Sequence, residues 1–334
     1  MMVPDRPRYR YRPIGSANSL ARVLEVSVPE LLRLAATADR LYRGPIRRPK
    51  KVGGYRETFD ALPALKALHR KIHNRILTSI SFPDYLMGGL RDPERSRGYV
   101  RNARRHAGAR LLIGEDAENF FPSVTSARIA AAFRHVCRFP PPVANLLAKL
   151  CTRHGVLPQG AITSPYLANL ALYREEPELH KSLSEQGIEY TRFIDDMNAS
   201  TKQQLSAQSR TEVVRMLRGA LERAGLRPKR KKQVIAGSGS QMVVNNLNVD
   251  KANVSRNRRY RHNLRAAVHQ LEIAARCGEF DSRIEKAFHS AATRVAGLRE
   301  LNPKEAERLQ YRLRRFKQAR RHAIRSKVFE REGS

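Results

Sequence analysis

The sequence has no tryptophan, three cysteines, and half as many acidic residues as basic ones. The cysteines, Cys137, Cys151 and Cys277, are odd in number and far apart, which argues against a disulfide framework and against a zinc knuckle. Their pattern is typical of reduced thiols in a cytoplasmic protein. Stacking platforms for nucleic-acid bases are still available, because the chain carries 11 tyrosines and 11 phenylalanines.

Long apolar runs are absent as well. No apolar stretch of about 20 residues is present, so we expect no membrane-spanning helix and no membrane partner. The N-terminus carries Arg6, Arg8, Arg10 and Arg12 where a secretion signal needs an apolar core. We interpret it as a basic arm that contacts RNA, with an organellar transit peptide as the alternative.

What the chain has in excess is positive charge. Lys and Arg number 64 against 31 Asp and Glu, which gives a net charge of +33 spread along all 334 residues. A surplus of this size favours a polyanionic partner such as nucleic acid. The length is sufficient for a large core and for two or three packed subdomains.

The most informative stretch runs from Tyr190 to Met197. Apolar residues alternate on both sides of Asp195-Asp196, the pattern of two short strands that meet at a tight turn. Two adjacent carboxylates in a half-apolar site repel each other and resist ionisation. A divalent metal ion relieves this repulsion, and Mg²⁺ prefers oxygen ligands. An Asp-rich surface turn is the alternative, and this stretch alone favours it.

Two more stretches carry polar residues beside apolar ones. Residues 111–116 form an apolar strand that ends on Asp116 and is followed by Phe120-Phe121, although Asp116 could instead be a helix N-cap. Residues 155–165 form a turn-rich loop with Gln159 that runs into a helix over 166–172. Backbone N–H groups at such a helix start attract anionic groups.

Basic residues gather in two loops and in the C-terminal part. Residues 47–56 contain a basic run, a Gly53-Gly54 hairpin turn and Arg56, and they could hold a triphosphate or be a solvated loop. A second basic turn spans residues 225–232, and residues 241–249 are predicted to form a strand. From Arg256 onward, three helices each combine an apolar stripe with a basic face.

In this order and spacing, the segments resemble reverse transcriptases. They are Asp116 with Phe120-Phe121, residues 157–160 with Ser164-Pro165, and Phe193-Ile194-Asp195-Asp196. Asn102-Ala103-x-x-His106 and the stretch 297–303 resemble the retron subgroup of that family. The resemblance covers roughly residues 17–320.

The resemblance implies an α+β right-hand polymerase fold with mixed fingers, an antiparallel-sheet palm and a helical thumb. The expected domains are a basic arm with fingers over residues 1–107, a palm with finger-associated helices over 108–250, and a basic helical thumb over 251–334.

The resemblance also implies the roles of individual residues. Asp116 and Asp195 would bridge two Mg²⁺ ions, with Asp196 more peripheral. The expected nucleotide-binding residues are Lys50, Lys51, Arg56, Phe120, Phe121, Gln159 and Lys232. Of these, Phe121 matches the aromatic gate that excludes a ribose 2′-OH. The expected RNA-binding residues are Asn102, His106, Arg256, Arg258 and Arg259.

The implied function is that of a retron reverse transcriptase. Such an enzyme copies a cognate non-coding RNA into short single-stranded DNA, primed from an internal RNA 2′-OH, and is associated with anti-phage defence. Its partners would be that RNA, the RNA–DNA hybrid, deoxynucleoside triphosphates and a retron effector protein.

The sequence departs from the family at two motifs. Phe193-Ile194 stands where Tyr-Ala is usual, and Val244-Asn245-Asn246 stands where retrons usually carry Val-Thr-Gly. Two alternatives remain open. One is another bacterial reverse transcriptase of the abortive-infection, CRISPR-associated or group II intron-like type. The other is a non-catalytic RNA-binding protein on a decayed palm, which the presence of all three aspartates disfavours.

Overall fold

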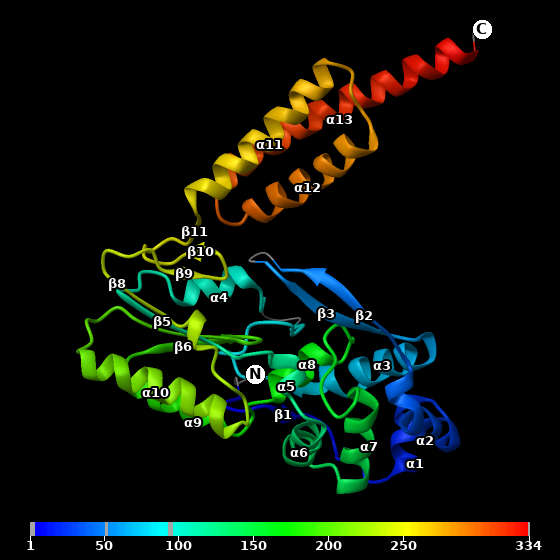
Figure 1. Ribbon diagram of the computed structural model, residues 1–334, viewed down its shortest axis with the longest axis vertical. Coiled ribbons are helices and arrows are strands. Elements are labelled where there is room, and N and C mark those ends of the chain that lie inside the picture. The colour runs from blue at the N-terminus through cyan, green and yellow to red at the C-terminus, as the bar shows by residue number, and fades with distance from the viewer. Residues whose placement is uncertain (1–3, 51–52, 93–95, 333–334) are drawn as a thin grey trace. The chain divides into compact units, whose positions relative to one another are not determined.

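The structure is a computed structural model that describes residues 4–50, 53–92 and 96–332. The chain packs as two compact units, Met1–Met242 and Val243–Ser334, each of which is described by itself below (Figure 1). The predicted division into fingers, palm and thumb at residues 107 and 250 stays a prediction.

The first unit combines helices with short antiparallel sheets. Its helices are α1 (Ala17–Leu24), α2 (Val28–Thr37), α3 (Pro63–Arg75), α4 (Tyr99–Arg105), α5 (Phe120–Ser123), α6 (Ser126–Val136), α7 (Pro141–Cys151), α8 (Ser164–Leu170), α9 (Glu175–Glu185) and α10 (Ala207–Arg223), with 3-10 turns η1 (Ala38–Arg40), η2 (Leu77–Ser79) and η3 (Arg230–Lys232). Its strands are β1 (Arg8–Tyr9), β2 (Tyr42–Pro49), β3 (Tyr55–Ala61), β4 (Ile80–Ser81), β5 (Leu111–Asp116), β6 (Glu189–Phe193), β7 (Asp196–Thr201) and β8 (Val234–Gly237).

Side-chain caps explain where the first helices begin. The Ser16 side chain accepts a hydrogen bond from the Ser19 backbone N–H at the start of α1, and Ser27 does the same for Glu30 at the start of α2. Each cap therefore starts a separate helix. Glu25 separates them in a left-handed conformation with φ of 50°.

A four-stranded antiparallel sheet with strand order β6-β7-β5-β8 forms the centre of the first unit. Helices α9 and α10 pack on one face of this sheet, and α4 packs on β6 from the other (Figure 1). Because side chains alternate along a strand, Tyr190 and Arg192 face α9 while Thr191 faces the opposite side.

A long hairpin, β2–β3, carries the predicted basic loop. The Phe59 backbone N–H on β3 donates a 2.8 Å hydrogen bond to the Gln159 carbonyl. Gly160 follows with φ of 110°, and a Cβ atom there would lie 2.9 Å from the Phe59 carbonyl oxygen. The close contact between the hairpin and the loop at residues 158–160 therefore requires glycine.

The second unit begins with three short strands, β9 (Val243–Val244), β10 (Leu247–Asn248) and β11 (Ser255–Arg256), paired in the order β11-β10-β9. The prediction of one strand over 241–249 is therefore wrong. Asn245 and Asn246 both have positive φ, 49° and 62°, and they turn the chain back on itself. Asn tolerates this conformation better than most residues, which explains why a hairpin forms here.

Three helices follow in the second unit: α11 (Arg258–Arg276), α12 (Ser282–Leu298) and α13 (Pro303–Glu332). They pack around one apolar core formed by the predicted stripes (Figure 1). Leu264, Val268 and Leu309 are among its buried members, while Ile284 and Phe288 are partly buried against it. The three amphipathic helices expected after Arg256 are confirmed.

Candidate active site

The three predicted carboxylates lie at one end of the central sheet. Asp116 is the last residue of β5, and Asp196, the first residue of β7, is its direct partner across the antiparallel pair. Opposed Cα atoms in such a pair are about 4.5–5.5 Å apart, and their side chains point to the same face. Asp195 precedes Asp196 in the turn that joins β6 to β7, and all three residues are half-buried.

The turn that carries Asp195 is tight and strained. Phe193 and Asp196 pair across it, so Ile194 and Asp195 are its two central residues. Ile194 has φ of 63°, whereas Asp195 does not have positive φ, the pattern of a type II′ turn that usually places glycine first. A β-branched residue in this conformation is a genuine outlier and must be held there by its surroundings.

Contacts around the turn hold Ile194 in this unfavourable conformation. The Ala117 backbone N–H donates a 3.1 Å hydrogen bond to the Asp195 carbonyl. The Ile194 side chain packs so closely on Gly88 and Gly89 that a Cβ atom on Gly89 would lie 2.7 Å from Ile194 Cδ1. The space left by two glycines therefore accommodates the larger residue that stands where the family usually has Ala.

The three carboxylates offer oxygen ligands that are chemically suited to a hard divalent cation. Among the described residues, no three His, Cys, Asp or Glu side chains are gathered closely enough to form a ready-made metal site. The backbone nevertheless brings Asp116, Asp195 and Asp196 to one strand end, where their oxygen donors are of the kind that Mg²⁺ prefers.

The predicted triphosphate-binding residues lie mainly on the β2–β3 hairpin. Lys50 is exposed just after β2, and its backbone N–H bonds the Gly54 carbonyl at 2.9 Å. Arg56 is exposed on β3, opposite Arg48. Lys51 lies outside the described residues, and Lys232 is described only through its backbone, at the end of η3.

The two aromatic residues after Asp116 have different environments. Phe121 is half-buried and packs at the edge of the main core, with its ring 6.0 Å from that of Phe120. Phe120 is only 3% exposed and belongs to the core, which favours a packing role, and its predicted contact with nucleotide stays a prediction. Gln159 is half-buried in the loop that contacts the β2–β3 hairpin through Phe59.

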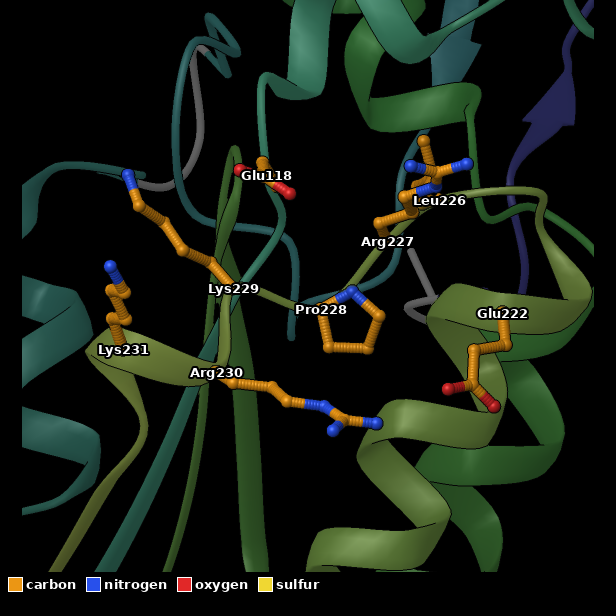
Figure 2. A pocket seen from close by; sticks show the side chains of 8 residues that line it. All are labelled: Glu118, Glu222, Leu226, Arg227, Pro228, Lys229, Arg230 and Lys231. Atoms are coloured by element: carbon orange, nitrogen blue, oxygen red, sulfur yellow. The ribbon is translucent and has the colours of Figure 1, made fainter.

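A basic cavity of about 520 Å³ lies beside Asp116. The Lys229 backbone N–H donates a 2.7 Å hydrogen bond to the Asp116 carbonyl, and the Glu118 N–H bonds the Arg227 carbonyl at 2.8 Å. The cavity is lined by Glu118, Glu222, Leu226, Arg227, Pro228, Lys229, Arg230 and Lys231. Figure 2 shows Lys229 and Lys231 extending to the same side of this cavity. Its four cationic side chains outnumber its two carboxylates, which favours an anionic ligand.

Asn102 and His106 are not surface residues. They are 0% and 1% exposed, which favours a structural role for both side chains, and their predicted contact with RNA stays a prediction. His106 bridges the two strands of the β6–β7 hairpin, at 2.7 Å from both Thr191 Oγ1 on β6 and Ser200 Oγ on β7. Burial, with a smaller effect of Arg105, lowers the pKa of His106 to about 3, so the imidazole is neutral.

Two buried networks on the opposite face of the sheet were missed by sequence reasoning. In one, Arg192 on β6 pairs with Glu176 on α9, and both side chains are almost completely buried. An arginine inside the otherwise apolar stretch before Asp195 was the available signal.

In the second network, Glu115 accepts a 2.9 Å bond from Arg218 Nε, and Arg218 Nη2 donates to Gln233 Oε1 at 2.7 Å. Burial raises the pKa of Glu115, although Arg218 opposes the shift. Gln233 directly follows Lys232, so the network holds the basic turn against the strand that carries Asp116.

The remaining predicted RNA-binding residues lie in the second unit. Arg258 and Arg259 are exposed in the first turn of α11. Arg256 is half-buried, and its guanidinium lies 4.8 Å from the centre of the Tyr260 ring.

Comparisons with known proteins match most of this chain. The family model "Reverse transcriptase (RNA-dependent DNA polymerase)" matches residues 48–258. The Retron Se72 reverse transcriptase of Salmonella heidelberg (strain 579083-10) is 28% identical over 88% of this chain and 76% of its own length. The Retron Ec86 reverse transcriptase of Escherichia coli is 30% identical over 79% of this chain and 82% of its own length.

A solved structure of telomerase from Candida albicans, in complex with a fragment of telomeric RNA, is 10% identical. It covers 62% of this chain and 46% of its own chain, at a TM-score of 0.40.

Proposed function

This chain belongs to the reverse transcriptase family as a retron-type member and is thus an RNA-directed DNA polymerase, and we propose that it copies a cognate structured non-coding RNA into short single-stranded DNA. The observation that carries the proposal is the meeting of Asp116, Asp195 and Asp196 at one end of the central sheet. Retention of all three carboxylates disfavours a decayed, non-catalytic palm.

In this proposal, Asp116 and Asp195 would hold two Mg²⁺ ions, and Asp196 would be more peripheral. When bound, the ions activate the primer hydroxyl and stabilise the leaving pyrophosphate of an in-line displacement. The protein's own part is to hold the carboxylate oxygens in place before the reaction, which the Ala117–Asp195 backbone bond supports.

The nucleotide would lie between the β2–β3 hairpin and the basic turn that ends at Lys232. Lys50, Lys51 and Arg56 would hold its triphosphate, and Lys232 would approach from the sheet. The four cations of the cavity beside Asp116 support phosphate binding on that side. Gln159 would lie beside the sugar and Phe121 would exclude its 2′-OH.

The RNA partner is supported by the charge of the whole chain. A net charge of +33 favours many phosphate contacts, and the exposed Arg258 and Arg259 offer such contacts in the second unit, with Arg256 beside them. We further propose priming from an internal RNA 2′-OH, an anti-phage role and a retron effector protein as partner. Across the described residues, no helix is both long and apolar enough to cross a bilayer.

Expression of the protein together with its own upstream locus tests the retron assignment. We expect a short single-stranded DNA that stays attached to RNA, because priming from a 2′-OH leaves a 2′,5′ branch. After RNase digestion, the 5′ end of this DNA should stay blocked until a 2′,5′-debranching enzyme is added. A parallel culture that expresses Asp195→Asn serves as control and should yield no such DNA. A free 5′ end would instead assign the protein to another class of bacterial reverse transcriptase.

A further inference from the structure

Arg192 lies two residues before Ile194, on the sheet face opposite the carboxylates, with 0% of its side chain exposed. Its guanidinium forms a bidentate salt bridge with Glu176, in which Nε donates to Oε1 at 2.6 Å and Nη2 donates to Oε2 at 2.8 Å. Glu176 Oε1 also accepts a 2.7 Å hydrogen bond from the Tyr190 hydroxyl. The carboxylate of Glu176 therefore fixes the plane of the guanidinium.

The remaining donors of Arg192 point to backbone carbonyls. Nη1 donates to the Ile194 carbonyl at 2.6 Å, and Nη2 donates to the Asn169 carbonyl on α8 at 3.0 Å. The Ile194 carbonyl belongs to the peptide bond that joins Ile194 to Asp195. A buried cation thus bonds the very peptide that orients a catalytic carboxylate.

This peptide needs such a contact because its conformation is unfavourable on its own. Ile194 has φ of 63°, and a β-branched residue persists there only when its neighbours fix it. The turn is held at three points: Arg192 bonds the Ile194 carbonyl, Ala117 bonds the Asp195 carbonyl, and Gly88 with Gly89 contact the Ile194 side chain. Arg192 is the only charged group among these contacts.

A purely structural role does not account for the choice of arginine. A buried ion pair is often no more stabilising than apolar residues of similar volume, so stability alone does not require Arg192. What a guanidinium offers is a rigid plane of donors that can bond Glu176, Asn169 and Ile194 at the same time. The ammonium group of lysine is a compact charge that cannot reproduce this arrangement.

We propose that Arg192, oriented by Glu176, is a positioning residue that fixes the Ile194–Asp195 peptide and thereby the carboxylates that bind the catalytic metal. The inference rests on the proposed metal-binding role of Asp116 and Asp195. Arg192 itself lies on the opposite face of the sheet and acts through the turn.

Metal binding tests the proposal directly, in a measurement that needs no catalysis. Mn²⁺ is titrated into the protein bound to a DNA primer annealed to an RNA template, and binding is followed by electron paramagnetic resonance. We expect Arg192→Lys to weaken Mn²⁺ binding by about 10–100-fold, as is typical when a partner that orients metal ligands is changed. The Mg²⁺ concentration for half-maximal primer extension should rise in parallel.

Arg128→Lys is the matched control. Arg128 pairs with Glu175, the neighbour of Glu176, and donates to the Ala171 carbonyl at 2.6 Å, and neither of these contacts is with the turn that carries Asp195. Its side chain is 17% exposed and that of Glu175 is 7% exposed, so this ion pair is largely buried, although less completely than Arg192 and Glu176. We expect this variant to lose thermal stability without a change in Mn²⁺ affinity.

Tyr190→Phe provides a second, milder variant in case Arg192→Lys fails to fold. It removes one hydrogen bond from Glu176 and should weaken Mn²⁺ binding by a smaller factor. The positioning role is overturned if the folded variants lower the melting temperature as the control does but bind Mn²⁺ like wild type. Absence of Mn²⁺ binding by the wild-type complex, or unimpaired extension by Asp195→Asn, would instead overturn the proposed function.

Discussion

At the scale of one residue, a substitution of Asp195 should affect DNA synthesis and RNA binding differently. It lies in the β6–β7 turn, whereas the positive charge is spread over the chain. We expect Asp195→Asn to abolish DNA synthesis and to leave RNA affinity nearly unchanged, because that affinity comes from many phosphate contacts. Primer extension and RNA binding by fluorescence anisotropy measure the two effects. Asp250→Asn, at an exposed position, is the control, and extension by Asp195→Asn within a few-fold of wild type would refute the assignment.

Phe121 and Phe120 offer a paired test of sugar selection. Phe121→Ala should allow ribonucleotides to be incorporated, because it removes the ring that would collide with a 2′-OH. Phe120→Ala should leave the choice of sugar unchanged and reduce the free energy of unfolding by about 3–5 kcal/mol, since its ring is only 3% exposed. Single-nucleotide incorporation of dATP and ATP, with thermal unfolding, distinguishes the two roles. Unchanged discrimination in Phe121→Ala would show that this ring only packs.

The identity of the residues indicated where the carboxylates lie more reliably than it indicated which polar and aromatic side chains are buried. Asp116 and Asp196 are eighty residues apart in sequence, and it was the resemblance to reverse transcriptases, rather than the strand pattern before each residue, that implied a common site. Asn102, His106 and Phe120 were assigned to ligands because polar and aromatic side chains serve both surfaces and cores. Their burial depends on packing against distant strands, such as Thr191 and Ser200 around His106, which local sequence does not specify.

At the scale of elements, His106 makes the attachment of α4 to the β6–β7 hairpin sensitive to acid. Its pKa falls from 6.5 to about 3 on folding, so the unfolded chain binds this proton more readily. The resulting stability is fully present above pH 6.5 and is lost as the pH falls from 6.5 towards 3. The loss from this group is at most about 4–5 kcal/mol, by the conversion of pKa shifts to free energy.

His106→Gln should remove that contribution. We expect the free energy of unfolding of wild type to fall more steeply between pH 7 and pH 4 than that of the variant. Urea unfolding at several pH values measures the difference in the free energy of unfolding between wild type and variant. The carboxylates are the same in both proteins, so their effects largely cancel in this difference. Parallel pH profiles would show that His106 takes up its proton without loss of the fold.

The β9–β10 turn explains one departure from the retron pattern. Asn245 and Asn246 both adopt positive φ, so two asparagines maintain a conformation for which glycine is also well suited. Asn246→Gly should leave the melting temperature close to that of wild type. Asn246→Val should destabilise the second unit by roughly 1–2 kcal/mol, because a β-branched side chain collides with its own backbone at positive φ. Equal melting temperatures for the two variants would contradict this account.

Periodicity predicted the elements that are long and regular, such as α11, α12 and β5. It did not predict breaks that depend on one backbone conformation. Glu25 ends α1 at positive φ and Asn245 begins a turn inside a predicted strand, although neither is glycine or proline. Ile194 is the extreme case, because no propensity assigns a β-branched residue to such a turn. Its contacts with Arg192, Gly88 and Gly89 and the Ala117–Asp195 backbone bond account for its conformation.

At the scale of the whole molecule, charge and fold have separate roles. The carboxylates of the proposed metal site occupy one strand end, whereas Lys and Arg occur in both units and in most loops. Such a distribution implies affinity through many weak contacts, with the geometry of the reaction set by a few residues. Added salt should therefore lower RNA affinity without disturbing the geometry of the site. It screens phosphate contacts but leaves buried networks such as Arg192–Glu176 largely intact.

RNA affinity should fall linearly with salt on a logarithmic scale, and single residues should change the slope. Arg258→Ala and Arg259→Ala should each reduce the slope by about 0.7–1, the expected effect of one lost phosphate contact. Arg215→Ala should leave it unchanged, because Glu212 already pairs with that side chain at 2.7 Å. Asn102→Ala should not alter the slope, since its side chain is buried and uncharged.

Anisotropy titrations between 50 and 400 mM salt, within the range of about 10–1000 mM over which screening lengths vary strongly, provide the measurement. A slope that Arg258→Ala and Arg259→Ala leave unchanged would show that the start of α11 does not contact RNA phosphate.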